Sequence, residues 1–149
     1  MKMILSSKDL DLFELDVVMV DGSFDPIHDG HIEYFRLASQ FGFPVLCNIA
    51  PDGWTKKKHS VLLPVANRAI VLDSIRYISF VTISTVSTAQ SLRNIHPKIY
   101  AKGKDWKSRG GIPQEEQEIC DQLNIKVEYL DSVLNSSSQL LMNFTNEDR

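Results

Sequence analysis

Short apolar runs alternate along the chain with segments of helical periodicity, and this alternation limits the possible folds more than any other feature. The five runs, rich in β-branched side chains, cover residues 17–20, 45–50, 80–83, 99–101 and 126–130. Runs of this length that close on Gly, Pro or Asp are typical of buried strands. Amphipathic helical patterns lie between and after them, over residues 31–41, 65–76 and 88–95, from Pro113 onwards and from about Ser138. Because parallel neighbours need crossover connections, the pattern predicts an α/β fold with a doubly wound, parallel, five-stranded sheet and helices on both faces.

Length and composition place the chain among ordinary globular proteins. Its 149 residues, 43% hydrophobic and 23% charged, fit a single domain over residues 1–149 with peripheral ends at 1–14 and 145–149. No apolar run approaches the roughly 20 residues of a membrane span, and the net charge of -3 disfavours a general nucleic-acid binder. We therefore expect a cytoplasmic protein without a membrane or nucleic-acid partner, with Cys47 and Cys120 reduced and buried.

Basic residues are concentrated in two short segments. Residues 52–68 hold four basic side chains against one carboxylate, and residues 98–109 hold five against one. Two basic segments in an acidic chain indicate a local anionic ligand, although solvated loops would give the same composition. Ligands of parallel sheets bind beyond the carboxyl ends of the strands, and both basic segments and three of the four histidines fall there.

The loop after the first strand carries the strongest chemical signal. Residues 22–31 read GSFDPIHDGH, so that His28 and His31 stand on either side of Gly30 where a helix begins. A helix N-terminus binds anions, glycine lets a phosphate approach the backbone, and imidazoles donate hydrogen bonds to phosphate oxygens. Zinc binding would need a third ligand that is not nearby, and His28 as a plain turn residue is the remaining alternative. The segment is neither a P-loop nor a G-x-G-x-x-G fingerprint.

These residues resemble the first loop of the cytidylyltransferase-like family of nucleotidyltransferases, G-x-F-D-x-x-H-x-G-H. Every specified position is filled, by Gly22, Phe24, Asp25, His28, Gly30 and His31. The resemblance extends over residues 16–142 and implies a Rossmann-like sheet. It is strongest to the nucleotidyltransferase half of bacterial ADP-heptose synthases and next to glycerol-3-phosphate cytidylyltransferases.

The resemblance implies transfer of a nucleoside monophosphate from CTP or ATP to a small phosphorylated sugar or polyol, with release of pyrophosphate. Catalytic roles are implied for His28, His31, one of the lysines 56–58 with Lys57 as first choice, and Arg68, whose alternative is an ion pair with a nearby acid. The implied nucleotide-binding residues are Gly22, Ser23, Phe24, Asp25, Gly30, Lys56, Lys102, Gly103, Asp105, Trp106, Ser136, Ser137 and Ser138. Mg²⁺ is the expected cofactor, bound mainly by the triphosphate and without a protein metal cage. A homodimer is a further expectation, because family members are often dimers.

Two departures from the family pattern affect substrate binding. The Arg that often precedes the serine–threonine motif is absent before Ser136, which Arg68 or Arg109 would have to replace, and Ala50-Pro51-Asp52 stands where heptose-type members have N-S-D. Two alternatives therefore stay open. One is an adenylyltransferase of cofactor biosynthesis, of the pantetheine-phosphate or nicotinamide-mononucleotide type. The other is a non-catalytic nucleotide-binding module.

Overall fold

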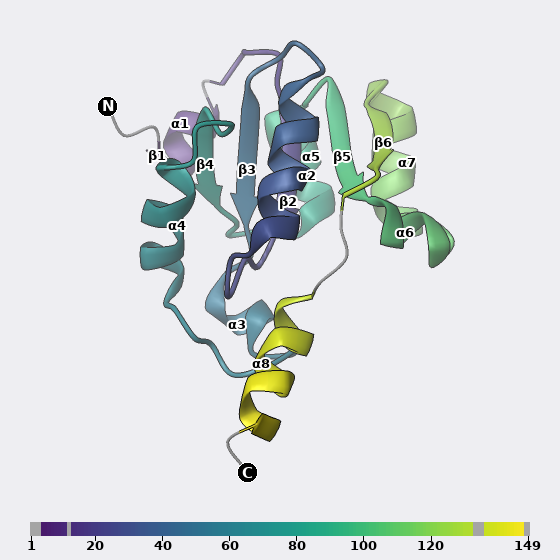
Figure 1. The fold of residues 1–149 in the computed structure, drawn as a ribbon. Helices are drawn as coiled ribbons and strands as arrows, with labels where there is room; N and C mark the ends of the chain where they lie inside the picture. The colour runs from purple at the N-terminus through teal and green to yellow at the C-terminus, as the bar shows by residue number, and fades with distance from the viewer. Residues whose placement is uncertain (1–3, 12, 133–135, 148–149) are drawn as a thin grey trace.

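A six-stranded parallel sheet organises the protein, in a computed structural model that describes residues 4–11, 13–132 and 136–147 (Figure 1). The strands run in the order β1-β4-β3-β2-β5-β6 across the sheet. Their bounds are β1 Ile4–Leu5, β2 Val18–Gly22, β3 Val45–Ile49, β4 Phe80–Ile83, β5 Ile99–Gly103 and β6 Lys126–Leu130. All described pairings are parallel, so every crossover contains at least one helix.

Helices cover both faces of the sheet and enclose two apolar cores. Their bounds are α1 Ser7–Asp11, α2 Asp29–Ser39, α3 Asp52–Thr55, α4 Val65–Asp73, α5 Thr88–Ile95, α6 Lys104–Ser108, α7 Gln114–Leu123 and α8 Ser137–Glu147. Phe35 of α2 and Leu72 of α4 pack with Val20 on one face. Leu92 of α5 and Ile119 of α7 pack with alternate strand residues on the other. Side chains of successive strand residues point to opposite faces, which explains why the buried strands read as continuous apolar runs.

The predicted α/β architecture is confirmed, and the five predicted strands correspond to β2–β6. The sheet has one further strand that we did not predict. The sixth strand, β1, pairs with β4 at the sheet edge. Residues 4–11 and Phe13 therefore contribute to the fold from the edge of the sheet, within the segment 1–14 that we predicted to be a peripheral end. Phe13 lies edge-on against Phe80, with ring centroids 5.4 Å apart. Strand β1 has only two residues, too few for an alternating or continuous apolar pattern to reveal it. The short helices α1, α3 and α6 were also not predicted.

The carboxyl ends of the strands meet at one edge of the sheet, where α3 and α8 lie beyond the strands and α6 follows β5 directly (Figure 1). Residues 145–147 end α8, and positions 148–149 of the predicted peripheral end lie outside the described residues. Cys47 and Cys120 are buried free thiols, as predicted. No helix of the described chain is long and apolar enough to cross a membrane.

Shortening Phe13 tests the part that the N-terminal segment plays in the fold. Phe13→Ala removes a half-buried ring from the core against Phe80, and we expect it to lower the free energy of unfolding by about 2 kcal/mol, less than a fully buried Phe would cost. Leu15→Ala is the control, because Leu15 is 54% exposed and its truncation should cost under ~0.5 kcal/mol. Urea denaturation measures both. Equal values for the two variants would show that residues 4–13 add nothing to stability.

Candidate active site

A hollow of about 570 Å³ opens at the carboxyl edge of the sheet and brings together most of the predicted site residues. Thirteen of the seventeen line it, namely Gly22, Ser23, Phe24, His28, Gly30, His31, Lys102, Gly103, Asp105, Trp106, Ser136, Ser137 and Ser138. The four that do not line it are Asp25, Lys56, Lys57 and Arg68. A second hollow of about 230 Å³ shares Lys58, Lys102 and Trp106 with the first. The two hollows are therefore adjacent.

His28 and His31 cap the start of α2 for each other. The His28 Nδ1 accepts a hydrogen bond from the Gly30 N–H at 3.1 Å, and the His31 Nδ1 accepts one from the His28 N–H at 3.2 Å. The two rings stack with centroids 3.7 Å apart. This is the arrangement of a capping box, in which two side chains satisfy the free N–H groups of a helix start.

The cap fixes the protonation state of both rings. An Nδ1 that accepts a hydrogen bond carries no proton, so each neutral imidazole carries its proton on Nε2. Burial lowers the pKa of His31 to about 3, aided by the neighbouring His28, and burial also lowers the pKa of His28. The Nε2 of His28 is buried, with no hydrogen-bond partner in the described chain. A buried N–H donor without a partner at the wall of a hollow is placed to bind an acceptor on a ligand.

Three helix N-termini meet at the larger hollow. The first is that of α2. The second is that of α6, whose N-cap is Gly103; a Cβ there would lie 2.6 Å from the Asp105 carboxylate and would force that side chain to move. The third is that of α8, where Ser136 Oγ accepts from the Gln139 N–H at 3.0 Å and Ser137 donates to the Pro26 carbonyl at 2.6 Å. Because the unpaired N–H groups of helix starts attract anions, the hollow favours a negatively charged ligand.

Lysines reach the hollow from strand β5 and from the loop after α3. Lys102 Nζ lies 2.6 Å from Asp21 Oδ1 and 4.5 Å from the centre of the Trp106 ring. Lys58 lines both hollows, whereas Lys56 and Lys57 are exposed and line neither. Of the three lysines among which the sequence left the choice open, with Lys57 as first choice, Lys58 is the one that lines the hollows. Three consecutive lysines in a loop give no periodicity from which their directions could be predicted.

Arg68 has a structural position and not the predicted catalytic one. It is 1% exposed, and its guanidinium donates to the carbonyls of Leu63, Ser23 and Ala50 and to the Asp52 carboxylate, at 2.6 to 3.0 Å. Its donors thus join the loops after β2 and β3 to the segment before α4. The alternative that we kept open, an ion pair with a nearby acid, is the one observed.

Asp25 also supports the loops from beneath. Its side chain is fully buried, and its carboxylate accepts from the N–H groups of Leu62 and Leu63 at 2.7 and 2.9 Å. It therefore anchors the lysine-bearing loop to the histidine-bearing one, instead of lining the hollow as predicted. Phe24, by contrast, lines the hollow with a positive φ of 53°, and its ring lies over Gly22 where a Cβ would come within 3.0 Å.

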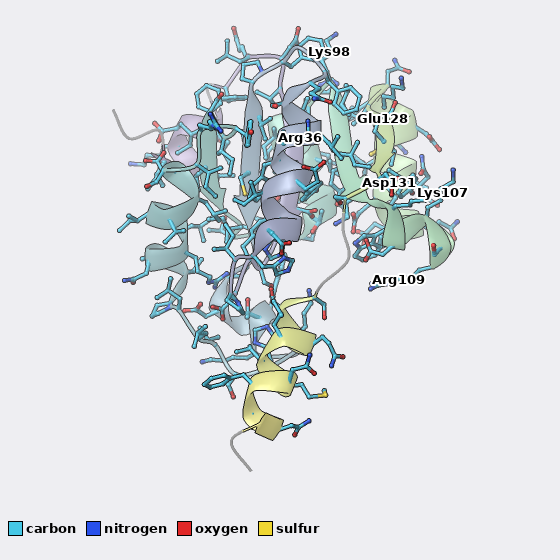
Figure 2. All side chains as sticks on the ribbon, in the orientation of Figure 1. Arg36, Lys98, Lys107, Arg109, Glu128 and Asp131 are labelled. Carbon is cyan, nitrogen blue, oxygen red and sulfur yellow. The ribbon has the colours of Figure 1, made fainter. Side chains whose placement is uncertain are left out.

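The second basic segment divides between the two ends of the sheet. Arg109 follows α6 and lines the larger hollow, with its guanidinium 5.1 Å from the Trp106 ring centre and 3.4 Å from the Asp105 carboxylate. Lys98 lies at the opposite end of the molecule (Figure 2). Arg68 and Arg109 were the two candidates to replace the Arg that is absent before Ser136. Of these, Arg109 lines the hollow and Arg68 does not.

Several lining residues were missed from the sequence. Tyr34 accepts from the Asp21 N–H at 3.4 Å and donates to the Ala101 carbonyl, so it joins three elements at the hollow. In the sequence, Tyr34 occupies one of the apolar positions of an amphipathic helix, so the pattern gives no indication that its hydroxyl forms hydrogen bonds. Asp21, Ser132 and Gln139 also line the hollow. Asp21 follows the last residue of a predicted strand, and this position at the carboxyl end could have identified it as a lining residue.

The fold and the histidine-lined hollow agree with the comparisons with known proteins. The chain matches the cytidylyltransferase-like family over residues 19–146, and it belongs to that family of nucleotidyltransferases. The Bifunctional protein HldE of Aliarcobacter butzleri is 29% identical over 77% of this chain and 24% of its own length. The FAD synthase of Pyrococcus horikoshii is 32% identical over 59% of this chain and 62% of its own length. The chain thus spans from about a quarter to under two thirds of these relatives.

Solved structures share the fold. A lipopolysaccharide core biosynthesis protein from Thermoplasma volcanium superposes with a TM-score of 0.67 at 18% identity, covering 81% of this chain and all of its own. A pantoate-beta-alanine ligase from Francisella tularensis gives a TM-score of 0.65 at 10% identity over 99% of this chain and 77% of its own. At these identities the likeness supports the Rossmann-like fold alone.

The depressed pKa of His31 predicts a loss of stability in acid. The neutral ring is kept in the folded state, while the unfolded chain takes up a proton below about pH 6.5, so stability is complete above that pH and falls toward pH 3. Between pH 7 and pH 5 this one group should cost about 2 kcal/mol. His31→Asn should remove that part of the pH dependence in urea denaturation, and the exposed His96→Asn should not. An unchanged slope in the His31 variant would contradict the assigned protonation state.

The buried position of Arg68 predicts a structural penalty for its removal. Arg68→Met leaves three carbonyls and the Asp52 carboxylate without their donor, and should lower the free energy of unfolding by about 3–5 kcal/mol. Arg36→Met breaks a partly exposed ion pair with Glu33 and should cost under ~1 kcal/mol. Denaturation curves of the two variants compare these values. A small loss for Arg68→Met, with turnover abolished, would return Arg68 to the predicted catalytic role.

Proposed function

We propose that the protein transfers a nucleoside monophosphate from CTP or ATP to the phosphate of a small phosphorylated sugar or polyol. An oxygen of the acceptor phosphate forms the new bond to the α-phosphorus, and the bond from that phosphorus to the bridging oxygen breaks, so that pyrophosphate leaves. The observation that carries the proposal is the pair of stacked neutral imidazoles at a helix N-terminus, of which the His28 Nε2 has no hydrogen-bond partner in the described chain.

The imidazoles act as preorganised hydrogen-bond donors. Negative charge grows on the oxygens of the α- and β-phosphates as the leaving group departs, and donors already held in place stabilise it without rearrangement. The backbone N–H groups at the starts of α2 and α8 add to the same field. Lys58, in the loop before α4, and Arg109, at the end of α6, would bind the remaining triphosphate charge from two sides of the hollow. Phosphoryl transfer needs such positioning and charge stabilisation more than covalent participation.

Magnesium fits this site as an ion bound together with the nucleotide. The described residues contain no group of three or more His, Cys, Asp or Glu side chains arranged to hold a metal. Mg²⁺ is commonly bound by one or two carboxylates plus substrate phosphates, and Asp105 at the hollow would be the protein ligand. When bound, the ion would neutralise triphosphate charge.

A second candidate is an adenylyltransferase of cofactor biosynthesis. The similarity to proteins named FAD synthase over 92 residues favours it. It uses the same phosphate chemistry and differs in the acceptor. The two candidate functions can therefore be distinguished by testing which phosphorylated acceptors react.

Pyrophosphate release tests the proposed reaction. The full chain with Mg²⁺ is incubated with each of CTP, ATP, UTP and GTP and with phosphorylated sugars, polyols, flavin mononucleotide, phosphopantetheine and nicotinamide mononucleotide. Release with a sugar or polyol phosphate supports the proposal, and release only with a cofactor precursor supports the second candidate. Nucleotide binding without release from any pair would leave a non-catalytic nucleotide-binding module.

The role of His28 has its own test. His28→Asn keeps a good N-cap side chain but removes the Nε2 donor, so turnover should fall by about 10²–10³-fold while the fold is retained. His96→Asn makes the same chemical change at an exposed helix end and should leave turnover unchanged. Steady-state kinetics and circular dichroism measure activity and folding separately. Full activity in the His28 variant would overturn the assigned role.

A further inference from the structure

The second hollow is polar because one face of the sheet changes character at its carboxyl edge. Asp21 on β2 and Asn48 on β3 are register partners, and Lys102 on β5 contacts Asp21. The preceding residues on this face, such as Met19 and Leu46, belong to an apolar core. Polar side chains that appear in register at the ends of three strands form one side of the hollow of about 230 Å³.

Asn48 lacks a partner inside this hollow. Its residue is 3% exposed, and its side-chain amide makes no hydrogen bond with any described residue. Asn48 lines the hollow, and its amide is not one of the enclosed, unpaired polar atoms of the described chain, so its hydrogen-bonding groups are open to a polar ligand in that space. In the sequence, Asn48 stands out as the polar residue in a strand of otherwise apolar residues, VLCNI.

Tyr100 joins two carboxylates at the same hollow. Its hydroxyl lies 3.0 Å from Asp21 Oδ2 and 2.8 Å from Glu116 Oε1, and Lys102 Nζ binds the other oxygen of Asp21. The phenol has a single proton and cannot donate to both carboxylates. Burial raises the pKa of Glu116 above its ordinary value. Lys102 balances the charge of Asp21, so the cluster suits neutral hydrogen-bonding groups.

We propose that the second hollow binds the hydroxyl groups of the phosphorylated acceptor, with Asn48 and Glu116 as specificity-determining residues. This inference rests on the proposed transferase function. The acceptor phosphate would lie at the boundary with the first hollow, which Lys58 and Lys102 line, and its hydroxyls would reach the amide and the carboxyl groups. The indoles of Trp54 and Trp106 line the same hollow and suit the C–H surface of a sugar or polyol.

An acceptor that carries an ammonium group fits less well. The Lys102 ammonium already occupies this region, 2.6 Å from Asp21 and 4.5 Å from the Trp106 ring centre. A second cation would be repelled by it, whereas a hydroxyl would not. The proposal therefore commits to a phosphorylated acceptor whose remaining polar groups are uncharged hydroxyls.

The test compares phosphorylated acceptors that carry hydroxyl groups with similar ones that lack them. Glycerol 3-phosphate is paired with propyl phosphate, and glucose 1-phosphate with cyclohexyl phosphate, with ethanolamine phosphate as the cationic probe. We expect the wild type to bind the better hydroxylated probe at least about tenfold more tightly than its hydroxyl-free partner. In Asn48→Leu this preference should shrink about five- to tenfold, the size of one lost hydrogen bond, with an unchanged KM for the nucleotide.

Glu116→Gln provides a second, milder variant and should weaken the same preference about threefold or more. Glu118→Gln is its matched control, since Glu118 is exposed on the same helix and accepts only from Gln114 among the described residues. Calorimetric titration of the probes into protein saturated with a non-hydrolysable nucleotide gives a readout independent of turnover.

Turnover with an unchanged hydroxyl preference in both variants, or a preference for ethanolamine phosphate, would overturn the inference and leave the transferase function standing. Hydroxyl-selective binding without turnover would overturn the proposed function alone, and binding without selectivity would overturn the inference.

Discussion

The two hydrogen bonds that backbone N–H groups donate to His28 and His31 determine what the rest of the site can do. They close the start of α2, and they leave each imidazole with its proton on Nε2. A protonated ring would lose its acceptor and the cap together, so helix stability and ligand chemistry require the same neutral form. The stacked pair thereby becomes a fixed set of donors, which is what stabilisation of a developing phosphate charge needs.

Rigid loops beneath the histidines are a second requirement, and two buried charged residues meet it. Arg68 ties the loop after β2 to the loop after β3, and Asp25 ties the histidine loop to the lysine loop. Both belong to the sequence pattern from which ligand contacts were predicted, yet both bind the protein itself. Loop segments that carry binding residues have few backbone hydrogen bonds of their own, so side chains must supply them.

The sequence predicted the architecture and the larger hollow well because these depend on local patterns. Apolar runs, helix signals and the spacing of His28, Gly30 and His31 are readable along the chain. Side-chain direction and partner choice could not be predicted in the same way, as the position of Lys58 at the hollow and the buried position of Arg68 show. Strand β1 was missed because two residues carry no pattern. The cluster of Tyr100, Asp21 and Glu116 joins three elements far apart in the chain, and no local rule brings them together.

The two hollows are connected through residues that serve both. Lys102 binds Asp21 at the junction and lies over the Trp106 ring, so it connects the two hollows that we propose to hold the acceptor and the nucleotide. Asp21 also contacts Tyr100, so one carboxylate joins the phenol of the smaller hollow to the ammonium group that lines both. An acceptor that satisfies Asn48 and Glu116 would therefore also fix the electrostatic field where the two phosphates meet. A transferase gains from this arrangement, since the charge that it must stabilise develops only when both substrates are in place.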